Sequence, residues 1–251
     1  MTNLFLASAE QPPYEKILER TKNPFNLYSF YYIEELKNFK FPDYCKRIMV
    51  DSGAHTLQYT NNSPQTYQAF FERYVNFIKQ HKDDERITFI ELDIDNVIGW
   101  DKLQQWRETL LSLRDDMMIV WHKWSENLAK RDLWEEYVNQ FKFISIPNKD
   151  MKNINVHKAL DLAREKGIKV HGLAMTKPNL PYIYKFTSID SSTWASGGRF
   201  GNMYMFRGNK LVTINTAKIN TTKLQYNDLD YFNALQWKKL SNYMEGYNER
   251  V

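Results

Sequence analysis

Short apolar runs alternate with longer segments of helical periodicity along this chain of 251 residues. The short runs have the length and the β-branched or aromatic content of buried strands, and the longer segments carry apolar residues at three- and four-residue spacing. The pattern predicts strands at 3–7, 26–32, 47–50, 87–92, 117–121, 141–146, 168–171 and 186–189. It predicts helices at 13–20, 34–39, 64–80, 100–113, 125–140 and 156–166, a turn or short helix at 178–184, a hairpin at 202–215 and an amphipathic segment at 229–247.

Strands that alternate with helices in this way form parallel sheets. Seven or eight such units in one chain favour an α/β fold of the (β/α)₈ type, a TIM-like barrel, and an open doubly wound sheet is the alternative. No glycine-serine linker, low-complexity tract or repeat divides the sequence. We therefore expect residues 1–251 to form a single barrel domain, whose helical C-terminal segment, about 216–251, closes the barrel or packs on its side.

Composition narrows the classes of protein only slightly. The chain has 34 Lys and Arg against 30 Asp and Glu, a net charge of +4 that permits a polyanionic partner without requiring one. Cys45 is its one cysteine, so it can form neither an intrachain disulfide nor a cysteine-based zinc site. The opening residues lack a basic signal-peptide region and a membrane span, which predicts a soluble, cytoplasmic protein. No phosphate-binding glycine fingerprint is present, so no nucleotide cofactor is expected.

Ionisable residues follow several predicted strands, and in a barrel the active site gathers at these carboxyl ends. One such residue, Asp190, ends a short apolar run and precedes a loop of small residues with Gly197, Gly198 and Arg199. An Asp at such a place, taken alone, is usually a turn-former or a helix cap. Its repeated counterparts at other strand ends favour a site instead, and they are Asp51, Asp93, Asp95, His122 and His171.

Five motifs, taken in order, resemble the tRNA-guanine transglycosylase superfamily, and especially its phage-encoded members that insert 7-deazaguanines into DNA. The motifs are Asp51-Ser52-Gly53-Ala54, Ile90 to Asp95, Ile119-Val120-Trp121-His122, His171-Gly172-Leu173-Ala174 and Ile189-Asp190-Ser191-Ser192 with the following glycine loop and hairpin. The resemblance spans residues 3–215, and His122 stands where the family has a base-binding Gln. The zinc site of the tRNA-modifying members cannot be built with one cysteine, which favours DNA over tRNA as the substrate.

This resemblance implies that guanine in nucleic acid is exchanged for a 7-deazaguanine such as preQ₀ by a pentosyltransferase. Asp190 would be the nucleophile that forms a covalent link to the sugar, and Asp51 would be the general acid/base, although chemistry also permits the reverse assignment. Breaking an N-glycosidic bond through an oxocarbenium-like state suits two carboxylates. If the chain is phage-encoded, the expected location is the cytoplasm of the host cell.

The base pocket is expected to contain a carboxylate that accepts hydrogen bonds from a guanine-like base. We favour Asp95 over Asp93, because the two residues fall on the same face of an extended strand and Asp95 is nearer its end. Ser52 and the backbone of Gly53 and Gly172 are expected to line the pocket. Two histidines, His122 and His171, belong to the same predicted substrate-binding set, and the alternative for His122 is a structural role at a strand end.

Two cations, Lys177 and Arg199, are candidates for phosphate contacts, and the alternative for each is a solvated surface charge. A different class of function, a non-catalytic barrel that binds nucleic acid or a partner protein, also fits the sequence. A metal-dependent hydrolase is a further alternative, suggested by Asp93 and Asp95 with nearby histidines. No His-x-His or His-Glu-x-x-His motif supports it, so we expect no metal site. A partner protein or a homo-oligomer is possible.

Overall fold

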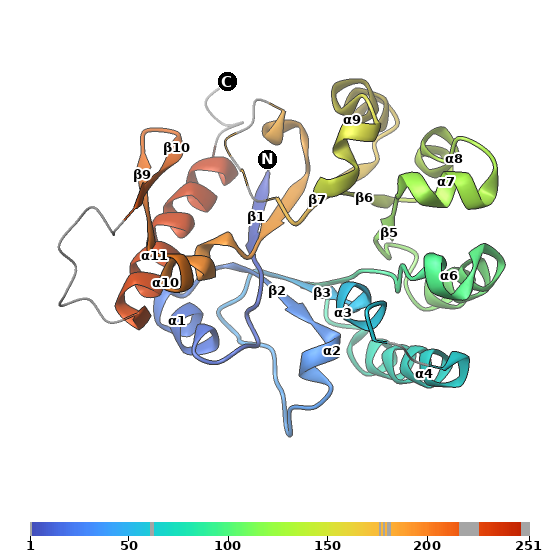
Figure 1. Ribbon diagram of the computed structural model, residues 1–251, viewed down its shortest axis with the longest axis horizontal. Coiled ribbons are helices and arrows are strands. Elements are labelled where there is room, and N and C mark those ends of the chain that lie inside the picture. The colour runs from blue at the N-terminus through green and yellow to red at the C-terminus, as the bar shows by residue number, and fades with distance from the viewer. Residues whose placement is uncertain are drawn as a thin grey trace.

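Eight parallel strands form one curled sheet in the computed structural model, which describes residues 2–60, 63–175, 177, 179, 182–215 and 226–246 (Figure 1). The strands lie in the order β4-β3-β2-β1-β8-β7-β6-β5. Their bounds are β1 Asn3–Leu6, β2 Phe25–Ser29, β3 Arg47–Asp51, β4 Ile87–Phe89, β5 Ile119–Val120, β6 Phe143–Pro147, β7 Lys169–Leu173 and β8 Ser188–Ser191.

The sheet curls until its two edge strands, β4 and β5, meet. A parallel bridge joins Ile90 to Met118, directly after β4 and before β5. The Met118 N–H donates to the Phe89 carbonyl at 2.9 Å, and the Glu91 N–H donates to the Met118 carbonyl at 3.0 Å. An open doubly wound sheet would keep these edges apart, so this alternative is wrong. The expectation of a TIM-like α/β barrel is confirmed.

Alternation along the strands divides the apolar residues into two layers. One cluster lies inside the barrel and consists of Phe5, Ala7, Phe25, Leu27, Met49, Ile90, Met118, Val120 and Phe143. The residues between them, such as Leu4, Ile48 and Ile144, face the helices and belong to the larger outer core. Because the period is two residues, any strand residue in step with the inner cluster points into the barrel.

Helices cover the outside of the sheet (Figure 1). The longer ones are α1 Tyr14–Thr21, α4 Pro64–His81, α6 Trp100–Leu113, α7 Lys123–Ala129, α8 Trp134–Gln140, α9 Val156–Glu165 and α11 Tyr226–Glu245. The short ones are α2 Phe30–Ile33, α3 Ala54–Leu57, α5 Asp95–Ile98, α10 Gly197–Phe200 and the 3-10 helices η1 Asn148–Asn153, η2 Ile183–Lys185 and η3 Thr193–Ser196. Among the helices of the described residues, none combines the length and the apolar content that a bilayer span requires.

The connection from β2 to β3 differs from its prediction. Strand β2 ends at Ser29 and the one-turn helix α2 begins at once, so the predicted strand 26–32 is three residues too long at its C-terminal end. The predicted helix 34–39 is wrong, because these residues form turns and a bend. Asn38 takes a φ of 59°, a left-handed conformation that interrupts a right-handed helix.

The predicted helix 125–140 is divided into α7 and α8. Lys130 ends α7 with a φ of 55°. The buried carboxylate of Glu126 explains the break, because it accepts the indole N–H of Trp121 at 3.0 Å and the backbone N–H of Leu133 at 3.3 Å. Glu126 therefore holds the segment between the two helices against the core. Helical periodicity in the sequence does not predict a break of this kind, because the break depends on contacts of a buried acid.

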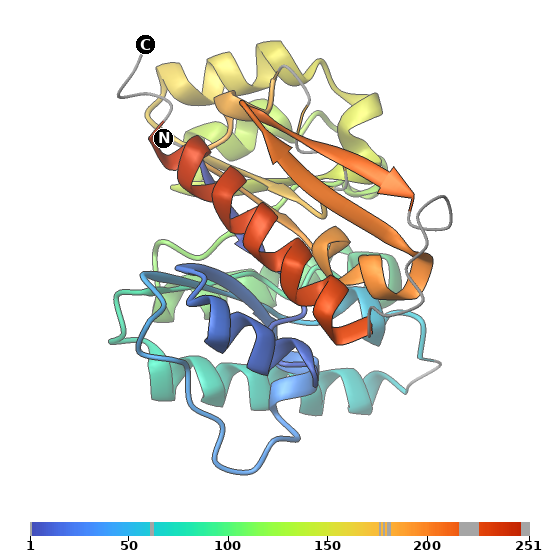
Figure 2. The ribbon, with the colours of Figure 1, turned by 90° about the vertical axis from the view of Figure 1, so that its left-hand side faces the viewer.

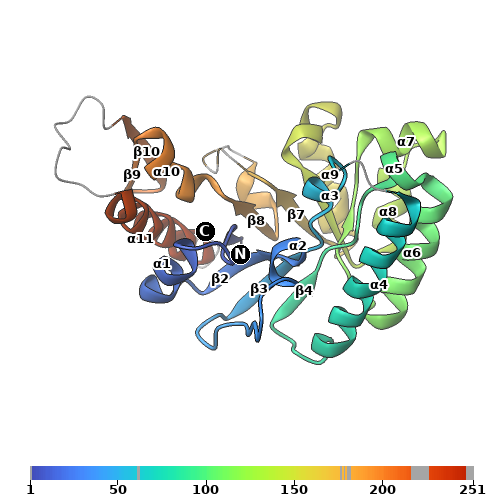
Figure 3. The ribbon, with the colours of Figure 1, turned by 60° about the horizontal axis from the view of Figure 1, so that its bottom comes forward.

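The antiparallel hairpin of β9 Asn202–Arg207 and β10 Lys210–Asn215 matches its predicted range, and it lies with α11 at one end of the molecule (Figures 2 and 3). Side chains of α11 cover the outer edge of β9: Asn233 accepts the N–H of Tyr204 at 2.8 Å, and Gln236 accepts that of Phe206 at 3.1 Å. Helix α11 also packs against α1 and β1, so this described part of the C-terminal segment lies on the side of the barrel, and residues 216–225 and 247–251 lie outside the described residues.

A buried ion pair reinforces the seam where β4 meets β5. Arg107 of α6 binds the Glu91 carboxylate through both Nε and Nη2, each at 2.8 Å, and the Val120 N–H donates to the same carboxylate at 2.7 Å. The ion pair is almost completely buried, with side-chain exposures of 3% and 1%. Glu91 therefore links the layer of helices to both edge strands of the barrel.

We expect Glu91→Ala to destabilise the protein by about 3–5 kcal/mol, because it leaves a buried guanidinium without its partner. Glu34→Ala, which removes the surface ion pair with Arg73, is the matched control and should cost at most about 1 kcal/mol. Urea unfolding followed by circular dichroism measures both changes. Equal losses in the two variants would contradict a special role of Glu91 at the seam.

Candidate functional site

The barrel interior ends in ionisable side chains that follow the inner alternation. Asp51 is two residues beyond Met49 on β3, and His122 is two residues beyond Val120. Asp190 pairs in register with Phe5 of the inner cluster. The backbone therefore delivers these side chains to one place, the carboxyl end of the barrel, as the sequence predicted.

Asp190 is held by two donors that contact the same oxygen atom. His171 Nε2 lies 3.0 Å from Asp190 Oδ1, and the Ala174 N–H donates to Oδ1 at 2.8 Å. Among the contacts of the described residues, none reaches Oδ2, so this oxygen is the one left for a substrate. Asp190 lies within β8 rather than after it, because the strand ends at Ser191, two residues later than expected. Its position in a ladder makes the carboxylate more rigid than a loop residue would be.

His171 acts on Asp190 and leaves no nitrogen for a substrate. Its ring is fully buried, its Nδ1 lies 2.8 Å from Ser188 Oγ, and its edge packs against the ring of Phe5. With Ser188 donating to Nδ1, Nε2 carries the proton and donates to Asp190. The geometry thus gives His171 a positioning role in place of the predicted contact with substrate.

Asp51 has the opposite environment, with little to stabilise a charge. Its carboxylate accepts one long hydrogen bond, from the Gly53 N–H at 3.3 Å. Burial, followed by the negative charges of Asp93 and Asp190, raises the pKa of Asp51 to about 7. Near neutral pH this carboxyl group therefore exists in both forms, which is the property of a group that gives and takes protons.

A fourth acid, Glu10, stands at the same end of the barrel and was not predicted. It follows β1, is buried, and accepts the Ser29 N–H at 3.3 Å. Burial raises the pKa of Glu10, and its charge adds to the repulsion on Asp51. No motif marks it in the sequence, because a short turn separates it from the end of its strand.

His122 bridges two carboxylates at the end of β5. Its Nε2 lies 2.6 Å from Asp93 Oδ2 and its Nδ1 lies 2.8 Å from Asp150 Oδ2. Burial alone lowers the pKa of His122, but the hydrogen bonds to Asp150 and Asp93 outweigh it, so that the pKa is raised. Asp150, in η1 after β6, was not predicted. The signal that identified the other acids, an ionisable residue shortly after a predicted strand, is also present at Asp150.

The expectation that Asp93 and Asp95 lie on the same face of an extended strand is wrong. The ladder of β4 ends at Phe89, and Asp95 begins the helix α5. Asp95 is buried, and both its oxygens are occupied: Trp124 Nε1 donates at 2.7 Å and Ser125 Oγ at 2.5 Å. Asp93 instead faces His122 and its charge acts on Asp51, so Asp93 is the better candidate for the pocket.

The predicted pocket residues of small size have structural functions. Ser52 is buried and donates to the Glu91 carbonyl at 2.8 Å. Gly53 has a φ of 87°, and a Cβ there would lie 2.3 Å from the Cβ of Tyr31. A Cβ at Gly172 would lie 3.1 Å from Met175 and 3.2 Å from Ile189. Close packing therefore explains both glycines, and contact between their backbone and a substrate stays a prediction.

The two candidate phosphate ligands differ in what the structure describes. Lys177 is exposed in the connection that follows β7, at the same end of the barrel as Asp190. Arg199 belongs to α10, but its side chain lies outside the described part of the structure. Neither contact with nucleic acid is tested. Within the described residues, no group of three or more His, Cys, Asp or Glu side chains is arranged to hold a metal ion.

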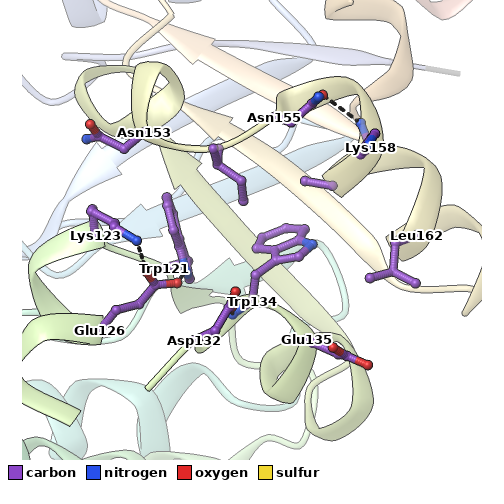
Figure 4. Close-up of a pocket in the computed structure, with 12 residues that line it drawn as sticks. Trp121, Lys123, Glu126, Asp132, Trp134, Glu135, Asn153, Asn155, Lys158 and Leu162 are labelled. Carbon is purple, nitrogen blue, oxygen red and sulfur yellow. Dashed lines mark hydrogen bonds and ion pairs between the residues drawn. The ribbon is translucent and has the colours of Figure 1, made fainter. Parts of the chain in front are cut away.

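A separate hollow of about 290 Å³ lies outside the barrel, beside its carboxyl end (Figure 4). Trp121 and Trp134 form one wall, and residues of η1 and α9, including Asn153 and Lys158, form the other. Asn153 also contacts Asp150 at 3.4 Å. The acids at the end of the barrel do not line this hollow, so it is distinct from the candidate site.

No protein-family model matches the chain, and no curated protein matches it at a significant level. Among solved structures the chain is similar to QR15, an aldolase, with a TM-score of 0.44 and 10% sequence identity. The match covers 77% of this chain and 90% of that chain. A likeness of this degree carries no argument about function, so the function must be argued from the site itself.

We expect Asp51→Asn to stabilise the protein at pH 8. The pKa of Asp51 is about 7 in the folded protein and about 4 in an unfolded chain, so the stability that its proton provides is lost as the pH rises through 7. Because part of the side chain is exposed, we expect a gain of about 1–3 kcal/mol at pH 8 that disappears near pH 4.

Urea unfolding at both pH values measures this difference, and Asp161→Asn, a surface acid paired with Lys185, is the control. If Asp51→Asn destabilises the protein at pH 8, or stabilises it equally at pH 4, the cost of ionising Asp51 is not the cause of the difference and the prediction is wrong.

Proposed function

We propose that this chain is a transglycosylase that exchanges guanine in nucleic acid, DNA in preference to tRNA, for a 7-deazaguanine such as preQ₀. One observation carries the proposal: an oriented carboxylate, Asp190, lies close enough to Asp51 for its charge to add to burial and to the Asp93 charge, which together raise the pKa of Asp51 to about 7. A nucleophile and a proton donor with these properties are what cleavage of an N-glycosidic bond requires. The ordered motifs that resemble the tRNA-guanine transglycosylase superfamily support the same reaction.

In the first half of the proposed reaction, Asp190 attacks the sugar. Its Oδ2 forms a bond to C1′ while the bond from C1′ to the guanine nitrogen breaks, and protonated Asp51 gives its proton to the departing base. Contacts from His171 and Ala174 to Oδ1 hold the carboxylate in one orientation. The products are a covalent sugar ester on Asp190, free guanine and ionised Asp51.

In the second half the roles reverse. Ionised Asp51 removes the proton from the incoming 7-deazaguanine, whose nitrogen attacks C1′ and releases Asp190 as a carboxylate. The proton on Asp51 is restored, so the cycle needs no cofactor and no metal. Asp93, which faces the same end of the barrel and contributes to the shift of Asp51, would accept hydrogen bonds from the base. Lys177 and Arg199 are the proposed contacts for the phosphates on either side of the target nucleotide.

Asp190→Ala should reduce base exchange by at least about a thousandfold, because it removes the nucleophile. Guanine-containing duplex DNA, single-stranded DNA and tRNA are each incubated with preQ₀, and the nucleosides are then measured by mass spectrometry. Asp161→Ala is the control and should exchange the base at the wild-type rate. Exchange by Asp190→Ala at the wild-type rate contradicts the assignment, and binding of nucleic acid without exchange by the wild-type protein would favour the non-catalytic barrel.

The pH dependence of the first half-reaction distinguishes the two assignments of the acids. If Asp51 is the proton donor, the single-turnover rate of sugar-ester formation is constant below pH 7 and falls about tenfold per pH unit above it, because only protonated Asp51 can protonate guanine. Rapid quenching followed by intact-protein mass spectrometry measures the ester. A rate that increases with pH through 7 would indicate the reverse assignment, with Asp51 as the nucleophile.

A further inference from the structure

Asp150, His122 and Asp93 form a hydrogen-bonded network in which His122 contacts a carboxylate through each of its two ring nitrogens. A histidine with a purely structural role in a core needs fewer charged partners than this. All three residues come from different units of the barrel: Asp93 follows β4, His122 follows β5 and Asp150 belongs to η1 after β6. His122 and Asp150 are buried, with 2% and 5% of their surfaces exposed. Of these three residues only Asp93, at one end of the hydrogen-bonded network, retains appreciable exposure, with 16% of its side chain accessible.

The geometry requires one proton more in this hydrogen-bonded network than a neutral His122 between two ionised carboxylates would have. A neutral imidazole has one N–H donor, yet both nitrogens of His122 lie within 2.8 Å of a carboxylate oxygen. One of the two contacts would be repulsive unless the ring is protonated or one of the acids is. A ring with two donors satisfies both contacts at once, with a carboxylate at each end.

Neighbouring groups favour the charge on the ring. The indole of Trp124 stacks on His122, with centroids 3.7 Å apart and an angle of 15° between the planes. Its N–H donates to Asp95 at 2.7 Å, which polarises the indole and makes its face a better partner for a cation. Lys149, whose Nζ lies 4.1 Å from the centroid of Trp124, opposes this effect.

The same contacts leave one atom of Asp93 for a ligand. Its Oδ2 binds His122, and among the contacts of the described residues none involves Oδ1. Oδ1 is therefore a fixed acceptor at the carboxyl end of the barrel, near Asp51. Since both nitrogens of His122 are occupied, the ring contacts no substrate directly, in contrast to the family Gln that it replaces in the resemblance.

We propose that Asp150 and His122 are positioning residues, which hold Asp93 as an oriented, charged acceptor for N–H groups of the exchanged base. This inference rests on the proposed function for the identity of the base, but the arrangement itself does not. Through Asp93 these hydrogen bonds also affect catalysis, because the Asp93 charge contributes to the raised pKa of Asp51. The hydrogen bonds act on the base directly through Asp93, but on the chemical step only as one of several contributions to the pKa of Asp51, so weakening them should reduce the affinity for the base more than the rate of the chemical step.

The first test is the NMR titration of the imidazole signals of the whole protein. His122 is assigned as the signal absent from His122→Gln, and the exposed His55 is the internal reference. We expect His122 to titrate at higher pH than His55 in the wild type, and at lower pH in Asp150→Asn than in the wild type, because one anionic partner is lost. A wild-type midpoint below that of His55, or a midpoint unchanged by Asp150→Asn, would overturn the proposal.

The second test separates binding from chemistry. In Asp150→Asn the KM for preQ₀ should rise roughly tenfold, while kcat changes less than about threefold. Asp161→Asn should leave both constants unchanged, and near-UV circular dichroism establishes that each variant is folded. If Asp150→Asn does not fold, His122→Gln replaces it, because an amide retains hydrogen-bonding atoms without the charge. Equal effects on KM and kcat, or none, would contradict a positioning role.

These outcomes are distinguishable from failure of the proposed function. If the wild type exchanges no base but His122 titrates as expected, the proposed reaction is wrong and the chain of hydrogen bonds stands. Calorimetric binding of preQ₀ and guanine to the wild type and to Asp150→Asn then tests the base contact without any turnover, and equal affinities would refute it. If exchange occurs and neither the titration nor KM responds to Asp150→Asn, the proposed reaction stands and this inference alone fails.

Discussion

Burial of several carboxyl groups at the end of the barrel, together with the repulsion between their charges, is the constraint on which the rest of the site depends. Asp51, Asp93, Asp190 and Glu10 are close enough for the last three to disfavour a negative charge on Asp51. All four cannot be ionised together without a large cost in a partly buried place. The hydrogen-bond donors around each acid therefore determine which acid carries a proton. The acids consequently have different chemical properties.

The division follows from where the donors lie. Among the contacts of the described residues, Asp190 accepts from His171 and the Ala174 N–H, and Asp93 contacts His122, whereas Asp51 accepts only one long hydrogen bond, from Gly53. The donors to Asp190 and Asp93 come from a neighbouring strand or from the residues directly after it, so the parallel register of the barrel brings them together, whereas Gly53 follows the same strand as Asp51. An oriented carboxylate beside a half-protonated acid would suit the glycosidic chemistry that we propose, and His171 and His122 orient the two carboxylates next to that acid.

Much of this arrangement could be predicted from the sequence because it depends on local patterns. Short apolar runs that end in an ionisable residue predicted Asp51, His122 and Asp190 at the carboxyl ends of strands, and helix α6, Trp100–Leu113, was predicted to the residue. The failures arise where distant contacts override the local pattern. Asp95 was favoured over Asp93 because the chain was assumed to remain extended, but it turns into α5. Glu126, a buried acid, broke a helix whose periodicity continues past it.

The titration of Asp51 tests the account most directly, because every assigned role depends on which acid carries the proton. Carbon-13 NMR of protein labelled at the aspartate carboxyl groups can follow it, with the Asp51 signal identified by its absence in Asp51→Asn. The account predicts a midpoint near pH 7 that falls when Asp190 or Asp93 is replaced by Asn, since each removes a negative charge. A midpoint near pH 4 that is insensitive to both substitutions would contradict it.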